Sequence, residues 1–481
     1  MKILKIKILL VAAGLVALVS GCKRGIDDFG TLNQNPNATT VPVTAALLTN
    51  AQANLSGFGW GNALNIAGGL YAQYFSETQY TDQSRYASPT VNWDGIYAGP
   101  LYDLQNIINV NANPQTKDRA ALYGSNNNQI AIARILKAYY FMQLTDAFGD
   151  IPYREALKGE GVLAYEKQEV IYPDLINELK AAVAQFDNGA TVQGDIIYAG
   201  NTTKWKKLAN SLRAIMALRM SKANATLGRT EFAAAIAAGV IDNNADNFQI
   251  NFPGGSFQNP LYVYYNVTQR FDYATSKTVT DRLQALNDPR INVFASSTVG
   301  FPYGLSRDQA IAFATANPNW SLIMAPQYRT ETSPVYLLTA ANLYFARAEA
   351  ALLGWTTESV SAMYTAGVTA ALSQWGISSG DITTYLAQPG VILAPGNELQ
   401  RIAEQRWLSH FPEGMSGWSL WRRTGLPALT PAPGTTTIPR RLPYGPNEQL
   451  YNPANYQTAA NQYTVGGVSN SMFARVWWDR P

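Results

Sequence analysis

The sequence predicts a mainly α-helical protein, in which pairs of amphipathic helices form the scaffold and little β structure is present. Three observations support this fold class. Apolar side chains recur at helical spacing in several separate segments, and the stretches between these segments are long, irregular and rich in aromatic residues. Charged residues make up only 14% of the chain, below the roughly 25% of ordinary soluble domains. The polar surface must therefore consist largely of uncharged side chains, which suits neutral, hydroxyl-rich ligands.

The first residues of the chain indicate export. A basic start (1–7) precedes an apolar run (8–19) that has the length of a signal-peptide core and is too short to span a bilayer. The run ends in the sequence Val-Ser-Gly-Cys (19–22), which resembles the bacterial lipobox, where the cysteine is acylated and becomes the new N-terminus. The alternative is an ordinary secretory leader with an incidental cysteine. Because Cys22 is the single cysteine of the chain and occupies the required position, lipidation is favoured.

These signals divide the chain into three parts. We expect a signal peptide at 1–21, a lipidated N-terminus with a polar, flexible tether at 22–40, and one helical domain at 41–481. Several acyl chains on Cys22 would give a lasting membrane anchor, where a single chain would not. No later segment is long and apolar enough to cross a bilayer. The sequence therefore predicts a domain that lipid holds at a membrane surface.

The composition excludes several classes of function. Three lysines in the leader account for the whole surplus of 36 basic over 33 acidic residues. The mature chain is therefore formally neutral, and nucleic acid is not expected as a partner. One histidine and one cysteine cannot build a histidine-rich zinc site, a thiolate cage or a disulfide. We expect no metal site and no cofactor.

The predicted helices follow the apolar periodicity. Pro173 in the second helix is tolerable only in a first turn or at a kink, Thr202 can cap the third helix, and Gly354 can close the fourth. Paired helices of this kind are typical of tetratricopeptide-type scaffolds, although no strict repeat period is present. The expected helices span residues 129–148, 169–186, 203–224, 337–353, 359–375 and 399–409.

Long loops between the helices are the natural place for a binding site, because loops of this length in a compact protein are usually functional. The C-terminal run at 475–479 is too apolar for a free tail, and we expect it to dock on the domain. The main irregular stretches span residues 77–93, 247–272, 299–331 and 427–462.

The first of these loops is the leading candidate for a sugar-binding site. Sugar binding needs flat apolar faces for the C–H side of the ring, together with amides and charged groups for the hydroxyls. Tyr and Trp supply such faces at a low cost in side-chain entropy. For Trp93, the alternative is that it begins the next helix and belongs to the core. The candidate ligand-binding residues are Tyr80, Asp82, Arg85, Tyr86, Asn92 and Trp93.

Two further loops contain candidate binding residues. Tyr264 and Asn266 lie in a tyrosine-rich run (262–266), where the alternation of a strand would be the structural explanation. Trp60 lies in the run Gly-Phe-Gly-Trp-Gly (57–61), whose glycines give the backbone freedom around the ring.

Two arginines and the only histidine have mainly structural explanations. Arg422 and Arg423 could clamp an anionic ligand through bidentate hydrogen bonds, but an internal ion pair with Glu349 or Glu404 is favoured. His410 stands at a helix end, and we expect it to be structural or at the surface. No catalytic residue is predicted.

Short blocks along the chain resemble the motifs of a known family. The run Asp-Ala-Phe-Gly-Asp-Ile-Pro-Tyr (146–153) and the run Trp-Arg-Arg-Thr-Gly-Leu-Pro (421–427) are similar to motifs of the SusD/RagB family, the nutrient-binding outer-membrane lipoproteins of the Bacteroidetes. The similar blocks keep the family's order across nearly the whole mature chain. They lie at 133–141, 146–153, 165–172, 195–213, 287–290, 348–355, 421–427, 438–441 and 477–479.

The resemblance implies a tetratricopeptide-like scaffold whose variable loops bind the ligand. It also implies a lipid-anchored protein on the outer face of the outer membrane, which closes over a SusC-like TonB-dependent transporter. Such proteins pass a glycan, or in some members a peptide, to the transporter, and they are not enzymes. The similar blocks belong to the scaffold and leave the identity of the ligand open.

Two other classes of function remain as alternatives. A helical glycoside hydrolase would need two carboxylates about 5–10 Å apart across a cleft, and the 33 acidic residues are enough to supply such a pair. A protein–protein adaptor lipoprotein is the second alternative, because helical repeat scaffolds often present extended binding surfaces. Released reducing ends would identify the hydrolase, and an adaptor should bind no oligomeric nutrient without its partner.

Overall fold

The computed structural model describes residues 42–87, 91–159 and 161–481. The predicted signal peptide at 1–21, the lipidation site Cys22 and the tether at 22–40 lie outside the described residues. The chain divides into two units, Met1–Val43 and Thr44–Pro481, and the second unit contains the helical scaffold. Within the described ranges, every helix is either too short or too polar to cross a bilayer.

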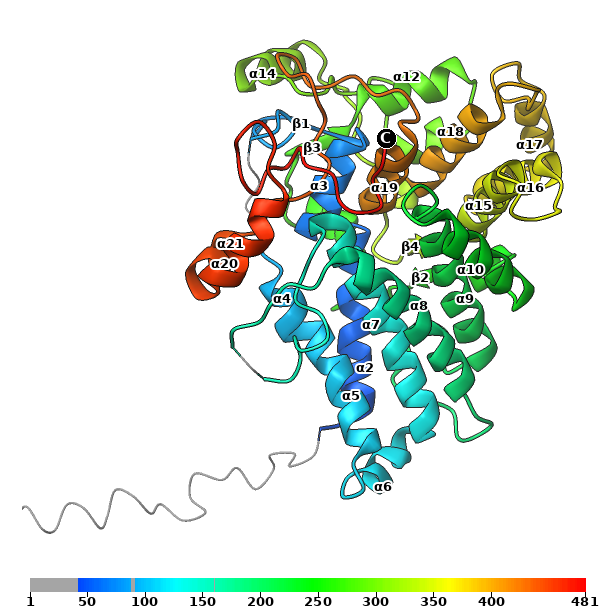
Figure 1. Cartoon of the computed structure of the whole chain (residues 1–481). Coiled ribbons are helices and arrows are strands. Elements are labelled where there is room, and N and C mark those ends of the chain that lie inside the picture. The colour runs from blue at the N-terminus through cyan, green and yellow to red at the C-terminus, as the bar shows by residue number, and fades with distance from the viewer. Residues whose placement is uncertain (1–41, 88–90, 160) are drawn as a thin grey trace, which may run out of the picture. The chain divides into compact units, whose positions relative to one another are not determined.

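Packed helix pairs form most of the second unit, which confirms the predicted mainly α fold class (Figure 1). Each pair buries the apolar side of both helices, as the periodicity predicts. The pairs formed by consecutive helices are α7 (Asn126–Phe148) with α8 (Gln168–Gln185), α9 (Thr202–Arg219) with α10 (Ala225–Ala237), α15 (Ala340–Leu352) with α16 (Val360–Ser373), and α18 (Glu398–His410) with α19 (Gly414–Thr424).

The remaining elements are shorter and connect or cover these pairs. Two small antiparallel sheets are present in the described residues, and they pair β1 (Phe75–Glu77) with β3 (Tyr273–Thr275) and β2 (Phe248–Ile250) with β4 (Val335–Leu338). The other helices are α2 (Thr44–Ala53), α3 (Ala63–Tyr71), α4 (Asp94–Ile96), α5 (Tyr102–Ala112), α6 (Lys117–Ala120), α11 (Pro260–Tyr262), α12 (Lys277–Ala285), α13 (Ile291–Phe294), α14 (Arg307–Ala316), α17 (Ser379–Leu386), α20 (Pro446–Tyr451) and α21 (Pro453–Gln462).

The predicted cap and end of the third helix are both wrong. Asn201, not Thr202, caps α9, because the Asn201 side chain accepts a hydrogen bond from the backbone N–H of Lys204 at 3.1 Å. The helix ends at Arg219 instead of reaching residue 224, since Asn224 caps the next helix, α10. Asn at an N-cap satisfies an otherwise unpaired N–H group, which is why it separates one helix from another so effectively.

The predicted helix at 337–353 is wrong at its start. Its first residues belong to β4, in which Leu338 lies opposite Phe248 of β2. Thr339 then caps α15 in a capping box with Asn342, and this reciprocal pair of hydrogen bonds fixes the helix start at residue 340.

Three of the predicted irregular stretches contain helices. The stretch 299–331 includes α14, which starts with a capping box at Ser306, and the stretch 427–462 includes α20 and α21. Residues 262–266 form a helical segment (α11 and the π-helical turn η6, Val263–Val267), so the explanation of these residues by strand alternation is wrong. Short helices of this kind leave too little periodicity in the sequence to be predicted.

A buried ion pair holds the scaffold together. Arg423 donates two hydrogen bonds to Glu349, at 2.6 and 2.7 Å, as predicted. Burial alone would raise the pKa of Glu349, but Arg423 and Arg406 lower it below its usual value. Arg422 forms no ion pair within the described residues: it donates to the carbonyl oxygen of Asp146 at 2.7 Å, and its guanidinium stacks on tryptophan rings. Both arginines are therefore structural.

The C-terminal run docks on the domain, as predicted. Trp478 is fully buried, and its indole N–H donates to the carboxylate of Asp146 at 2.8 Å. Asp479 is also buried and pairs with Arg440 at 2.6 Å. These contacts join the similar blocks at 438–441 and 477–479 to α7.

Candidate functional site

The short sheet of β1 and β3 brings two of the candidate loops together. In this sheet Glu77 lies opposite Tyr273, and the pairing continues one residue further, where the N–H of Thr78 donates to the carbonyl oxygen of Asp272 at 2.9 Å. The hydroxyl of Thr78 also donates to the carbonyl oxygen of Phe271 at 2.6 Å. The loop that follows β1 and the loop that precedes β3 therefore lie side by side, although about two hundred residues separate them in the sequence.

Asp272 connects the side chains of these two loops. Its carboxylate accepts hydrogen bonds from Gln79 at 2.7 Å, from Arg270 at 2.7 Å and from the hydroxyl of Tyr264 at 3.1 Å. Burial on its own would raise the pKa of Asp272, but the hydrogen bonds from these three side chains lower it. The carboxylate is therefore charged at neutral pH and fixes the orientation of the side chains around it.

Trp60 lies beneath this cluster. Its ring meets the rings of Tyr264 and Tyr273 edge-on, with centroid separations of 5.2 and 5.4 Å. Only 2% of Trp60 is exposed, so the expectation that it presents an open face to a ligand is wrong. Packing of this kind instead holds Tyr264 in place from below.

Several side chains of the two loops remain exposed. Tyr80 is 59% exposed and Phe271 is 44% exposed. Asn266 is exposed, and its side-chain oxygen accepts a hydrogen bond from Arg329 at 3.3 Å. We call this surface the β1–β3 face, and it consists of Tyr80, Tyr264, Asn266, Arg270 and Phe271.

Asp82 and Arg85 lie in the turn that follows the β1–β3 face, and both are exposed. A buried carboxyl supports this turn, because Glu77 accepts a hydrogen bond from the N–H of Ser84 at 2.7 Å. Burial raises the pKa of Glu77 to about 7, against the lowering effect of the hydrogen bonds from Ser84. Glu77 thus titrates near neutral pH at the base of the turn.

The other candidate residues of the first loop lie against a later stretch of the chain, residues 432–445. Tyr86 is 7% exposed, and its hydroxyl accepts a hydrogen bond from the N–H of Ala432 at 3.0 Å. Asn92 is exposed and contacts Gly445 so closely that a side chain at position 445 would collide with it. The sequence-predicted residues therefore separate into two groups, one on the β1–β3 face and one beside residues 443–473.

Trp93 belongs to the core, as the alternative explanation proposed. It is 4% exposed, its ring lies 4.8 Å from that of Phe148, and it immediately precedes α4. Its indole N–H donates to Glu448 of α20 at 2.9 Å, and the hydroxyl of Tyr165 contacts the same carboxylate. The expectation of an exposed stacking face at Trp93 is therefore wrong, because the ring is used to hold α20 against the scaffold.

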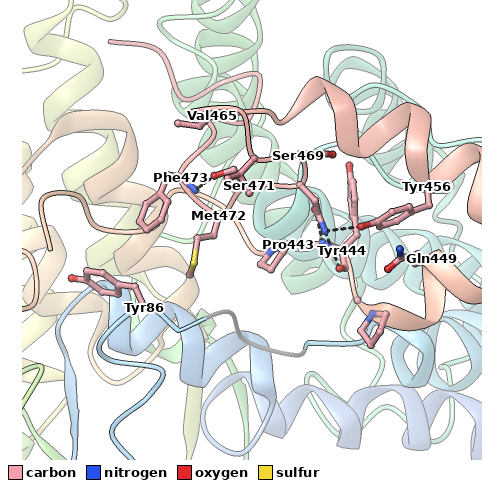
Figure 2. Close-up of a pocket in the computed structure, with 14 residues that line it drawn as sticks. Tyr86, Pro443, Tyr444, Gln449, Tyr456, Val465, Ser469, Ser471, Met472 and Phe473 are labelled. Carbon is pink, nitrogen blue, oxygen red and sulfur yellow. Dashed lines mark hydrogen bonds between the residues drawn. The ribbon is translucent and has the colours of Figure 1, made fainter. Parts of the chain in front are cut away.

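A cavity of about 530 Å³ opens between Tyr86 and residues 443–473 (Figure 2). We call it the C-terminal cavity. Its volume lies within the range of small-molecule sites. The sequence pattern marked 427–462 as a long loop but singled out no residue in it. The side chains that define the cavity are Tyr86, Pro443, Gln449, Tyr456, Ser469, Ser471, Met472 and Phe473.

Three features of the described residues bear on metal binding and catalysis. Among them, no group of three His, Cys, Asp or Glu side chains could hold a metal ion. His410 is buried, and burial holds its pKa well below its usual value. A Gly-x-Ser-x-Gly run occurs at 376–380, but its Ser378 caps α17 and donates to Asp381 at 2.7 Å. That serine therefore serves as a helix cap and not as a nucleophile poised at a sharp turn.

The helix-pair scaffold defines a mainly helical protein with exposed aromatic side chains in its loops. The chain belongs to the SusD-like family, because the family model described as "Starch-binding associating with outer membrane" matches residues 36–445. This is a family of nutrient-binding proteins associated with the outer membrane. No curated protein matches the chain.

Solved structures agree with this assignment. A chitin-binding protein is 28% identical, with a TM-score of 0.76 over 91% of this chain and 99% of that one. A chitin-binding SusD homologue from Flavobacterium johnsoniae is 26% identical, with a TM-score of 0.74 over 91% and 97% of the two chains. A SusD homologue from Bacteroides uniformis is 25% identical, with a TM-score of 0.76 over 90% and 99%. The predicted family resemblance is confirmed.

Proposed function

We propose that this protein binds an uncharged glycan without cleaving it, and that the β1–β3 face contacts the ligand. The observation that carries the proposal is the convergence of two separate loops on one small sheet, where the exposed residues Tyr80 and Phe271 adjoin the hydrogen-bonded pair Gln79 and Asp272 in sequence. The family description and the chitin-binding relatives support a glycan over a peptide.

The chemistry of the face suits sugar rings. Tyr80 and Phe271 are exposed enough to lie against the C–H side of a pyranose ring. Asn266 supplies amide donors for hydroxyl groups, and Arg270 keeps donors free because only part of its guanidinium is used by Asp272. Asp272 orients Arg270 and Tyr264 before a ligand arrives, which reduces the entropy lost on binding.

We further propose that the protein is a lipoprotein anchored through Cys22 on the cell surface, where it delivers the glycan to a SusC-like TonB-dependent transporter. The lipobox-like sequence at 19–22 and the family membership support this part of the proposal. Mass spectrometry of the mature N-terminus tests the anchor: a free thiol on Cys22 would contradict it.

Calorimetric titration of the full-length protein tests glycan binding. The probes are maltohexaose and chitohexaose, together with a hexapeptide as the alternative ligand class. We expect one of the two hexasaccharides to bind, and Tyr80→Ala to weaken its binding about tenfold, which corresponds to the loss of one stacking contact. Because Tyr80 is largely exposed, the melting temperature of this variant should stay unchanged. Tyr451→Ala, at another exposed tyrosine (70%), is the matched control and should bind normally.

Three outcomes would contradict the proposal. If only the hexapeptide binds, the ligand class is wrong. If neither class binds, the protein is an adaptor or acts only with its transporter. If the bound hexasaccharide is shortened and new reducing ends appear, the protein is a hydrolase.

A further inference from the structure

The C-terminal cavity has the character of a site for a neutral, hydroxyl-bearing ring. The fourteen residues that line it are all uncharged, and they combine aromatic and apolar surfaces with amides and hydroxyls. Arg441 is not part of this lining, and its guanidinium stacks on the rings of Tyr444 and Tyr463 at 4.5 and 4.2 Å. A charged ligand would find no counter-charge in this lining, whereas a sugar ring would find both apolar faces and hydrogen-bonding groups.

The walls of the cavity are held in place by hydrogen bonds and by unusual backbone conformations. Tyr86 and Asn470 both have a positive φ, of 64° and 54°, which is uncommon for residues other than glycine. Asn470 uses its side chain inside the wall: it donates to the carbonyl oxygen of Tyr444 at 3.1 Å and accepts from the N–H of the same residue at 2.9 Å. The cavity is therefore formed before any ligand binds.

Other polar groups of the lining are free for a ligand. Gln449 is exposed on α20, and none of the hydrogen bonds within the described residues uses its side-chain amide. Ser469 is also exposed, and its hydroxyl makes only a long contact of 3.4 Å with Asn461. Both side chains lie at the edge of the cavity (Figure 2).

One short loop connects this cavity to the β1–β3 face. Tyr80 lies at the start of the loop on the β1–β3 face, and Tyr86 lies at its end on the cavity wall. Their Cα atoms are at most about 21 Å apart, because six extended residues reach no further. The turn between them is fixed by Glu77 and by the hydrogen bond from the N–H of Ala87 to the carbonyl oxygen of Asp82 at 2.9 Å.

We infer that the C-terminal cavity is a second subsite, which holds one neutral sugar ring of the oligomer whose neighbouring rings lie on the β1–β3 face. This inference rests on the proposed function, and it adds that the binding affinity increases with the length of the glycan. A short glycan occupies one subsite, whereas a longer one occupies both and gains the affinity of two linked contacts.

Filling the cavity tests the inference. Ser469→Trp places a large ring at the edge of the cavity, and the position is exposed, so the fold has room for it. With the hexasaccharide that binds the wild-type protein and the corresponding disaccharide as probes, calorimetry should show about tenfold weaker hexasaccharide binding. Disaccharide binding should be unchanged. Thr464→Trp, an exposed residue of the same segment that does not line the cavity, is the matched control and should change neither affinity.

A second variant distinguishes an effect on binding from an effect on the fold. Gln449→Ala removes an unused amide without adding bulk, and it should reduce the preference for the hexasaccharide while leaving the melting temperature unchanged. If both cavity variants bind the hexasaccharide like the wild type while Tyr80→Ala weakens it, the second subsite does not exist and the proposed function stands. If neither hexasaccharide binds the wild-type protein, the proposed function and the inference both fail.

Discussion

At the scale of single residues, burial separates the aromatic side chains that support the site from those that are free to bind. Trp60 and Trp93 have the chemistry of sugar-binding residues but lie in the core, whereas Tyr80 and Phe271 remain exposed. Composition alone cannot make this distinction, because a tryptophan contributes the same surface whether it stacks on a ligand or on its neighbours.

Trp93→Ala should strongly destabilise the protein. The change removes a buried ring and its hydrogen bond to Glu448, and large-to-small changes of this kind cost about 3–5 kcal/mol. The measurement is the free energy of unfolding in urea, with Tyr80→Ala as the exposed counterpart that should change it little. An unchanged stability would mean that the ring of Trp93 is exposed in solution.

Glu77 should make stability depend on pH. Its pKa is raised from 4.5 to about 7 in the folded protein, so the folded state binds the proton more tightly than the unfolded state does. The stabilisation is complete below pH 4.5 and is lost as the pH rises towards 7, by at most about 3 kcal/mol.

Glu77→Gln removes this dependence, because the amide stays neutral while it still accepts the hydrogen bond from Ser84. The difference in the free energy of unfolding between the variant and the wild type should therefore shift in favour of the variant from pH 4.5 to 8. Glu413, whose pKa burial also raises to about 7, remains in both proteins and gives them a common background. A difference that does not change with pH would show that Glu77 is hydrated.

At the scale of elements, caps and short strands decide where the helices begin. Strong periodicity over long segments predicts α7, α8 and α18 to within a few residues. It does not predict β1 or β3, because three residues are too few for an alternating pattern to be recognised. Since those two strands bring the candidate loops together, the sequence does not show that the residues of the proposed site lie side by side.

The cap of α9 offers a direct test at this scale. Asn201→Ala should destabilise the protein by about 1 kcal/mol, because the N–H of Lys204 loses its partner. Thr202→Ala changes the neighbouring residue, which the sequence pattern had favoured as the cap, and it should have a smaller effect. Thermal unfolding followed by circular dichroism measures both, and equal losses would contradict the assignment of the cap to Asn201.

At the scale of the whole molecule, the fold class and the family follow from the sequence, whereas the site follows only in part. The similar blocks, such as 146–153 and 421–427, pack into the scaffold, where Arg423, Glu349 and Trp478 make buried contacts that require particular side chains. Composition alone points to the candidate residues, and long-range pairing divides them between two surfaces. The sequence does not predict Gln79, Arg270 and Asp272 as site residues, because charged and amide residues in a loop become informative only once their partners are known.

The pairing of β1 with β3 also separates the residues that maintain the fold from the exposed residues that are available to a ligand. Main-chain pairing and the side chains of Thr78, Gln79 and Asp272 join the two loops there, whereas the exposed side chains of Tyr80 and Phe271 take part in none of these bonds. New sugars could then be accommodated by exchanging those side chains, while the helices beneath keep their sequence. One helical scaffold of this kind can therefore carry binding faces for many different glycans.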